Sequence, residues 1–359
     1  MSTLIGIIVV VGGIVFVHEL GHYTFAKLSG MRVEQFSIGF PPKIYGKKIG
    51  ETEYQISAIP LGGFVKVTGV IDESMDTEGT ENKEDPRSFA SKPTWQKLLF
   101  VTGGVLFNLI LAVLIFTIIT LSRGFQEPAT DKAIVGNLMQ NYPADSVGIE
   151  EGDRILSIEG KKVDKWEDMT AIIYEHPNDS VTVSWQHQGI QKSARLKTRM
   201  QQTIVNGKYK KVGIIGISAP TQHRSAGFFE SIGQGFALTG YWLKITVVSL
   251  KEMIVGHVSL KNVGGPVMIA QMAGESAKSG ILTLLGFMAI ISVNLALLNI
   301  LPIPALDGGH LIIVIIEGIR GKELSVKTKL RIQKIGMVFI FLLMGLVFYN
   351  DIVRLITGG

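Results

Sequence analysis

Long apolar runs separated by polar stretches dominate this 359-residue chain. A helix crosses the hydrocarbon core of a bilayer with about 20 predominantly apolar residues, and the pattern predicts four such segments. They are expected at residues 1–28, 98–121, 281–316 and 335–350. The predicted fold class is therefore a multi-pass α-helical membrane protein with about four spans.

Residues 29–70, after the first segment, follow a period-two pattern instead. Phe36, Ile38 and Phe40 alternate with smaller or polar residues, and glycine and proline interrupt the alternation, which predicts several short strands. Two interpretations stay open from these residues alone. The strands form either a small soluble hairpin or a membrane-associated β region whose exposed edge could pair with an extended peptide.

Three further stretches are not apolar enough for a plain span. Residues 71–97 are predicted to form a polar, acidic loop, which is either a linker or a lid. Residues 126–218 have the composition of one compact, β-rich domain with a helix at 166–174. Residues 225–262 are apolar but interrupted by charges, so we expect amphipathic helices at the membrane interface.

Composition and charge narrow the chemistry and the topology. The chain has no cysteine, which excludes Cys-ligated zinc and disulfides, and its net charge of +5 is not gathered in a patch suited to nucleic acid. Lys and Arg instead follow the first apolar segment and fill a basic loop predicted at 317–334. By the positive-inside rule both regions face the cytoplasm, and residues 126–262 lie outside. The first segment lacks a basic leader and a small-residue cleavage site, so we expect it to remain as a membrane helix.

The sequence HELGH at residues 18–22 lies near the end of the first apolar segment. On a helix, His18 and His22 are one turn apart and face the same way, so both imidazoles can bind one zinc ion. Glu19 then projects beside the ion, where it can take a proton from water. Two histidines and a glutamate are costly at membrane depth unless they are used, so an accidental pair is the weaker interpretation.

A catalytic zinc site takes three protein ligands, so a third ligand is needed. The longer soluble pattern H-E-x-x-H-x-x-G-x-x-H fails here, because Phe25 replaces its glycine. Asp307 is the best remaining candidate, since it lies between two apolar runs beside Pro302, Pro304 and Gly308. The prolines are expected to break the helix at this point. The Asp307 carboxylate is then a metal ligand, the N-cap of a following helix, or both.

The second predicted span carries one strongly polar residue, Asn108, shortly after Gly103 and Gly104. Paired glycines allow two membrane helices to approach closely. Asn108 either supports the site or joins helices by hydrogen bonds, and the sequence leaves both roles open.

Three motifs together resemble the site-2 protease family (peptidase M50-like), and more narrowly its bacterial regulator-of-sigma-E zinc metalloprotease type. They are HELGH at 18–22, NILPIPALDG at 299–308, and the pattern PAxxxGIxxGDxILxIxGxxVxxWxDM within 126–218, which is similar to bacterial PDZ domains. The resemblance covers nearly the whole chain. One departure is that this chain has room for a single PDZ domain, whereas the enzyme that names the type has two in tandem.

The resemblance implies a complete site. It consists of the Zn²⁺ ligands His18, His22 and Asp307, the general base Glu19, and the substrate-binding residues Asn299 and Asn294. It also implies that the β region clamps the substrate as a strand. His310, which follows the motif, is expected to be structural.

The implied activity is that of an intramembrane zinc metalloendopeptidase that cleaves single-span membrane proteins. An anti-sigma factor after a first cut, or a remnant signal peptide, is the expected substrate. The enzyme would lie in the bacterial inner membrane with its PDZ domain outside and its active site toward the cytoplasm. The PDZ domain would bind a peptide or exclude bulky substrates. The competing hypothesis is a non-catalytic PDZ-bearing scaffold with structural zinc. A metal transporter would need several intramembrane sites along a path, and the sequence shows one cluster.

Overall fold

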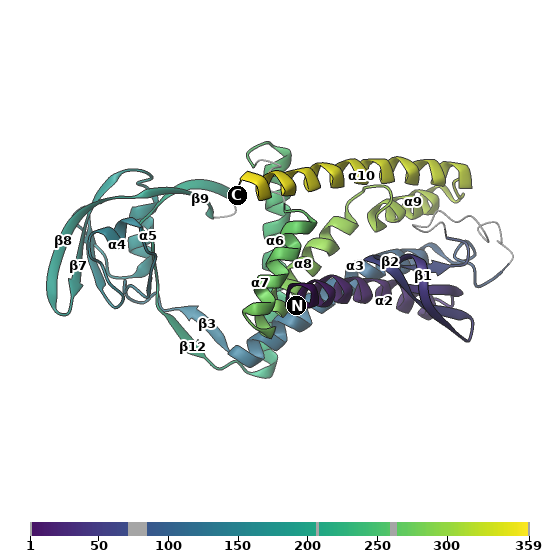
Figure 1. Cartoon of the computed structure of the whole chain (residues 1–359), viewed down its shortest axis with the longest axis horizontal. Helices are drawn as coiled ribbons and strands as arrows, with labels where there is room; N and C mark the ends of the chain where they lie inside the picture. The colour runs from purple at the N-terminus through teal and green to yellow at the C-terminus, as the bar shows by residue number, and fades with distance from the viewer. Residues whose placement is uncertain (1, 71–84, 206–207, 259–263, 358–359) are drawn as a thin grey trace. The chain divides into compact units, whose positions relative to one another are not determined.

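The computed structural model describes residues 2–70, 85–205, 208–258 and 264–357. The chain forms two compact units, one made of residues 1–119 and 229–359 and the other of residues 120–228. The first unit is mainly helical and the second is mainly β-structure (Figure 1). Most of the acidic loop predicted at 71–97 lies outside the described residues.

The helical unit is a bundle with four membrane-type helices. Its helices are α1 (Ser2–Ile7), the π-helical turn η1 (Ile8–Gly12), α2 (Gly13–Leu28), α3 (Thr94–Arg123), α6 (Phe228–Ile254), α7 (Pro266–Lys278), α8 (Ile281–Ile300), α9 (Asp307–Arg320) and α10 (Val326–Thr357). Among the described residues, the stretches long and apolar enough to cross a bilayer are Ile5–Leu28, Thr94–Arg123, Ile281–Ile300 and Val326–Ile356. The predicted multi-pass helical fold is confirmed.

The third predicted span is divided in two. α8 ends at Ile300, residues 301–306 are not helical, and α9 begins at Asp307. Proline lacks a backbone N–H, so Pro302 and Pro304 break the helix as expected. The prediction that Asp307 serves as an N-cap is wrong, because the N-cap position is Leu306 and no side chain caps the helix. As the first helical residue, Asp307 can turn its carboxylate away from the helix end.

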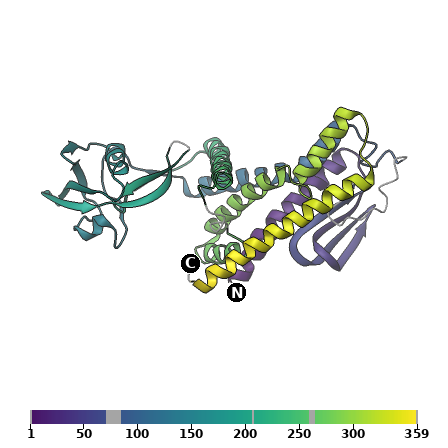
Figure 2. The same cartoon turned by 90° about the horizontal axis from the view of Figure 1, so that it is seen from above.

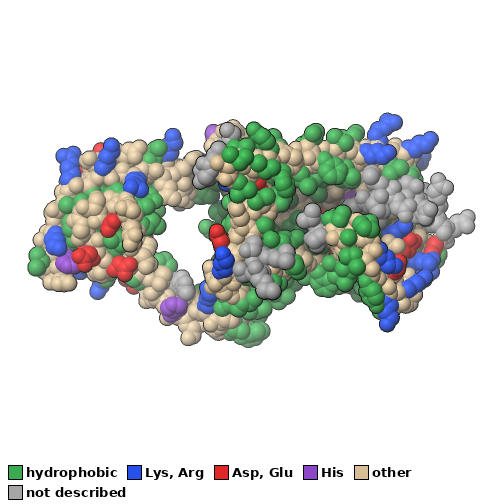
Figure 3. Space-filling model, in the orientation of Figure 1, with side chains coloured by type: hydrophobic (Ala, Val, Ile, Leu, Met, Phe, Trp, Pro, Cys, Tyr) green, Lys and Arg blue, Asp and Glu red, His purple; other side chains and the backbone are tan. Residues whose placement is uncertain are grey.

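The prediction of a basic loop at 317–334 is wrong for most of these residues, which are helical. α9 continues to Arg320 and α10 begins at Val326, since Lys, Arg, Leu and Gln are good helix formers. The Lys329 ammonium on α10 lies 2.8 Å from the Glu317 carboxylate on α9 and joins the two helices. From this end α10 extends as one long helix (Figure 2). Figure 3 shows Lys and Arg side chains gathered where α10 begins and hydrophobic side chains along the helix.

The described residues of the region predicted as one or two amphipathic helices form one long helix, α6. It packs against α3 at Gly235, where an added Cβ would lie 2.7 Å from the Val113 carbonyl oxygen. α6 is not among the four candidate spans of the described residues, and Lys244 and Lys251 interrupt its apolar run. An interfacial position for α6 stays a prediction.

The β region consists of β1 (Val33–Ile49) and β2 (Thr52–Val67), which lie beside α2 (Figure 1). Four short segments of these strands pair: 35–38 with both 63–66 and 53–56, and 43–49 with 52–57. The short strands predicted from the interrupted alternation therefore correspond to these paired segments, which belong to two long strands. Phe36 and Val65 pack in one hydrophobic cluster with Phe100 of α3, so the β region is held against the helices that carry the site.

The β-rich unit is described by itself. Its elements are β3 (Phe125–Pro128), β4 (Asn137–Leu138), α4 (Pro143–Ser146), β5 (Arg154–Ile158), β6 (Lys161–Lys162), α5 (Trp166–Tyr174), β7 (Ser180–His187), β8 (Ile190–Lys197), β9 (Arg199–Val205), β10 (Lys208–Ile214), β11 (Ile217–Ser218) and β12 (Thr221–Arg224). A four-stranded sheet of order β6-β5-β7-β8 packs around Trp185 and Ile155. α5 matches the predicted helix, whereas the single turn of α4 is too short to show a helical period. Because β12 pairs with β3, the unit continues beyond residue 218.

Candidate metal centre

Two imidazoles of α2 converge on one point. His18 and His22 are both buried, and their Nε2 atoms lie 3.3 Å apart. The spacing of four residues places both rings on the same face of the helix, as the sequence predicts. Two nitrogen lone pairs at this distance repel one another unless a proton or a cation lies between them.

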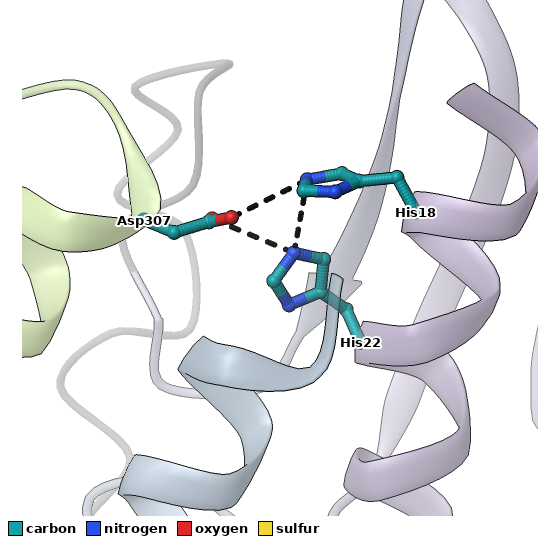
Figure 4. Close-up of side chains that lie close together, drawn as sticks. All are labelled: His18, His22 and Asp307. Carbon is teal, nitrogen blue, oxygen red and sulfur yellow. Dashed lines mark hydrogen bonds and ion pairs between the residues drawn. The ribbon is translucent and has the colours of Figure 1, made fainter. Parts of the chain in front are cut away.

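The Asp307 carboxylate reaches the same point from the start of α9. Its Oδ2 lies 3.3 Å from Nε2 of His18, and its Oδ1 lies 3.4 Å from Nε2 of His22. Figure 4 shows the carboxylate facing both rings from the opposite side of the cluster. The structure therefore brings together three side chains separated by almost three hundred residues of sequence, and they form a group that can hold a metal ion.

Each of the three separations is close to the spacing of two ligand atoms on one tetrahedral zinc ion, although the two imidazoles face different oxygens of the Asp307 carboxylate. Ligand atoms about 2.0–2.2 Å from zinc at tetrahedral angles lie about 3.3–3.6 Å from one another. The Asp307 Oδ2 is buried and has no hydrogen-bond partner among the described residues. Buried carboxylate oxygens normally have a partner, and a bound cation would serve as one here. Three protein ligands also leave a fourth position open, which is typical of catalytic zinc sites.

Two residues of α3 contact the Nδ1 atoms of both rings and so orient them. Nδ1 of His22 donates a hydrogen bond to the Phe100 carbonyl oxygen at 2.8 Å, so its Nε2 carries the free lone pair. The side-chain nitrogen of Asn108 lies 3.2 Å from Nδ1 of His18, and the amide oxygen is buried with no hydrogen-bond partner among the described residues. The two ends of an amide are nearly equal in size, so rotation of the amide places this oxygen at Nδ1, where it accepts a hydrogen bond from the Nδ1–H group. Both rings then present Nε2 to the metal position.

Glycines let α3 come this close. An added Cβ on Gly104 would lie 2.4 Å from Cε1 of His18 and 2.5 Å from Nε2 of His22. An added Cβ on Gly21 would lie 2.2 Å from the Gly103 carbonyl oxygen. The close approach predicted from the glycine pair is present, and Gly104 provides the space that the two imidazoles occupy.

Glu19 lies beside the metal group at a cavity of about 470 Å³. Its side chain is buried, and His22 and Asp307 line the same cavity. Phe64 and Val65 of β2 also line this cavity. The arrangement places a carboxylate, a metal position and a strand of the β region around one space large enough for several substrate atoms.

The two predicted substrate-binding asparagines are placed differently. The side-chain nitrogen of Asn299 lies 3.2 Å from Nε2 of His18, at the metal group. Asn294 lies elsewhere, since its amide oxygen accepts a hydrogen bond from the Thr246 hydroxyl of α6 at 2.7 Å. Among the described residues, the Asn294 side chain makes its hydrogen bond to Thr246 and none to the three metal-group residues. His310, which was expected to be structural, lines the cavity.

Comparisons with known proteins cover nearly the whole chain. The family model described as peptidase family M50 matches residues 6–343. The chain is 30% identical over 427 residues to the regulator of sigma-W protease RasP of Bacillus subtilis, covering 99% of both proteins. It is also 30% identical over 422 residues to the zinc metalloprotease RasP of Geobacillus kaustophilus, covering 98% of both. A solved PDZ domain of an SdrC-like protein from Listeria monocytogenes aligns with 26% of this chain and 92% of its own, at 21% identity and a TM-score of 0.21.

Proposed function

The chain belongs to peptidase family M50, the site-2 protease family of membrane zinc metalloproteases, and from that premise we propose that it cleaves single-span membrane proteins within the bilayer. His18, His22 and Asp307 are proposed as the zinc ligands and Glu19 as the general base. The observation that carries the proposal is the convergence of two Nε2 atoms and one carboxylate, together with a single cavity lined by Glu19, His22 and Asp307.

The proposed chemistry assigns a separate task to each group. His18, His22 and Asp307 would hold a zinc ion, which when bound would supply polarisation of a carbonyl group and activation of water. Glu19 takes the proton of the attacking water and gives it to the leaving amine. The amide N–H₂ of Asn299, which points toward the metal group, donates to the oxygen on which negative charge develops.

A transmembrane substrate must first lose its helix locally. Helical peptide bonds are shielded by i→i−4 hydrogen bonds, and breaking these in lipid leaves polar groups unsatisfied. Residues 63–66 of β2 pair with β1 along one edge, and Phe64 and Val65 line the cavity. An unwound substrate that pairs with this strand would recover its backbone hydrogen bonds beside Glu19.

The proposal extends to the class of substrate and to the location of the enzyme in the cell. One relative is named a regulator of sigma-W protease, which supports an anti-sigma factor after a first cut as a substrate; remnant signal peptides are a second class. Lys and Arg gather at the end of the helical unit that carries the β region and the start of α10 (Figure 3). By the positive-inside rule this end faces the cytoplasm of a bacterial inner membrane, with the predicted PDZ domain outside as a peptide-binding or size-screening module.

The test compares wild type with Glu19→Gln in the purified full-length protein. Wild type is expected to cut a single-span reporter in a zinc-dependent reaction, while Glu19→Gln binds zinc equally and does not cut. Cleavage by Glu19→Gln at the wild-type rate would exclude Glu19 as the base, and a wild type that binds zinc but never cuts would favour a scaffold. Membrane proteomics of cells with either form would then identify single-span precursors that accumulate with the mutant.

A further inference from the structure

The loop before Asp307 holds an unfavourable backbone conformation. Ala305 has φ = 74°, in the left-handed region that side chains with a Cβ rarely adopt. It lies two residues before Asp307, whose carboxylate completes the metal group. A strained residue keeps its conformation only when its surroundings hold it there, so the packing around residues 301–306 decides where Asp307 points.

One side of this loop is closed by the first turn of α9. An added Cβ on Gly308 would lie 2.0 Å from the Leu301 carbonyl oxygen, and one on Gly309 would lie 2.6 Å from the Ile303 carbonyl oxygen. Real Cβ atoms do not come this close to backbone oxygen. The loop therefore folds directly onto the glycine face of α9.

α10 contacts the loop at a third glycine. Gly336 is buried, and a Cβ there would lie 2.0 Å from the Pro304 carbonyl oxygen and 2.3 Å from its carbonyl carbon. These are backbone atoms of the residue next to Ala305, so they cannot rotate aside. Two turns earlier on α10, the ion pair of Lys329 with Glu317 fixes the helix to α9. By contrast, all residues from 341 to 346 of α10 are exposed.

We infer that Gly336 is a positioning residue for Asp307. The backbone of α10 packs directly against Pro304 at Gly336, and this contact stabilises the strained turn that directs the Asp307 carboxylate toward the two imidazoles. This inference rests on the proposed role of Asp307 as a zinc ligand. A side chain at position 336 moves α10 or the loop, and the metal site loses the geometry of its third ligand while the two imidazoles on α2 stay in place.

The test measures zinc affinity of the purified full-length protein by competition with a chromophoric chelator. Gly336→Ala is compared with Gly345→Ala on the same helix, where an added Cβ meets nothing within 4 Å. Both changes raise helix propensity equally, so only the Pro304 contact differs. Gly336→Ala is expected to bind zinc about tenfold more weakly, the usual loss when support of a ligand is removed, and to change the visible spectrum of the Co²⁺-loaded protein. Gly345→Ala is expected to match wild type in both.

Two further variants separate the possible failures. Asp307→Ala must lose zinc binding; if it does not, the ligand assignment fails and the inference fails with it. If Asp307→Ala loses zinc but Gly336→Ala matches wild type, the inference alone is overturned. Ala305→Gly tests the contact between α10 and the loop where Gly336→Ala does not fold. It removes the strain at residue 305, so its zinc affinity stays at the wild-type value if α10 holds the loop, and a loss of about tenfold overturns the inference.

Discussion

Asn108 lies 3.2 Å from Nδ1 of His18, and this contact ties an imidazole of the metal group to the neighbouring helix. Asn108 is completely buried, and its backbone carbonyl oxygen accepts a hydrogen bond from the Ser292 hydroxyl of α8 at 2.9 Å. One residue of α3 therefore connects α2 and α8 behind the site. The two roles that the sequence leaves open, helix joining and site support, are present together.

Replacing Asn108 with Leu should weaken zinc binding. The change removes the group that holds the His18 ring and its tautomer, and losses of such partners reduce metal affinity by about 10- to 100-fold. Ser292→Ala is the matched control, because its hydroxyl donates to the backbone carbonyl of Asn108 and not to the Asn108 side chain. The control is expected to lower thermal stability slightly and leave zinc affinity unchanged. Wild-type zinc affinity in Asn108→Leu would show that His18 is oriented without Asn108.

Gly104→Ala should disrupt the metal group by direct contact. The added methyl group would overlap both imidazole rings, so α3 must withdraw or the rings must turn. A displacement of about 1 Å is enough to cost on the order of 100-fold in cleavage, and zinc affinity should fall with it. Gly286→Ala of α8 serves as the control, since its nearest neighbour would be Ile119 Cδ1 at 3.6 Å. Equal zinc affinity in both variants would mean that the rings have room that the structure does not show.

Gly63→Ala should separate catalysis from metal binding. A Cβ at this position would lie 2.8 Å from Cγ of Glu19 and 2.6 Å from the Ser37 carbonyl oxygen, so the Glu19 side chain is displaced. Loss of a positioned general base costs about 10²–10⁴-fold in rate. We expect cleavage to fall toward that range while zinc affinity stays at the wild-type value.

A double-mutant cycle checks the cause of this loss. If Gly63→Ala acts through Glu19, adding it to Glu19→Gln should reduce residual cleavage no further. Additive losses would mean that Gly63 serves the substrate strand rather than the base.

Local sequence patterns explain why three of the predicted side chains come together. His18 and His22 share a helix, so their common face follows from the helical period alone. Asp307 was found because a carboxylate beside Pro302 and Pro304 in an apolar run has little structural purpose. Asn294 was assigned through the resemblance, and the structure turns it toward Thr246, since a residue's direction on a helix depends on which neighbours pack there.

Other features depend on tertiary packing that one sequence does not encode locally. Gly104 was predicted to allow close helix contact, but its neighbours, the two imidazoles, depend on how α3 meets α2. The prediction of a loop at 317–334 follows from its charge, and it fails because charge indicates exposure and not the absence of a helix. The Lys329–Glu317 pair that joins α9 to α10 has no signature in sequence.

The turn of the β region should be held by a pH-dependent contact. Glu51, in the turn between β1 and β2, accepts a hydrogen bond from Lys27 at the end of α2 at 2.8 Å and one from Arg87 at 2.9 Å. The hydrogen bond from Lys27 is the largest cause that lowers the pKa of Glu51, with the charges of Lys27 and Arg87 acting in the same direction. The folded-state pKa lies below the unfolded value, so the stabilisation is complete above about pH 4.3 and is lost as pH falls through the folded-state pKa.

The chain has no cysteine, so a single spin label at Ile49→Cys, an exposed position of β1 beside the turn, can report its mobility. In the parent protein, label mobility should stay low at pH 6 and rise as pH falls through the lowered pKa of Glu51. In Glu51→Gln it should already be high at pH 6 and change little with acid. Glu53→Gln is the control, because the Glu53–Lys43 ion pair lies within the β region and does not reach α2. Its label should respond to pH as the parent does. An identical pH response in Glu51→Gln would mean that the turn is held by strand pairing and not by the contact with Lys27.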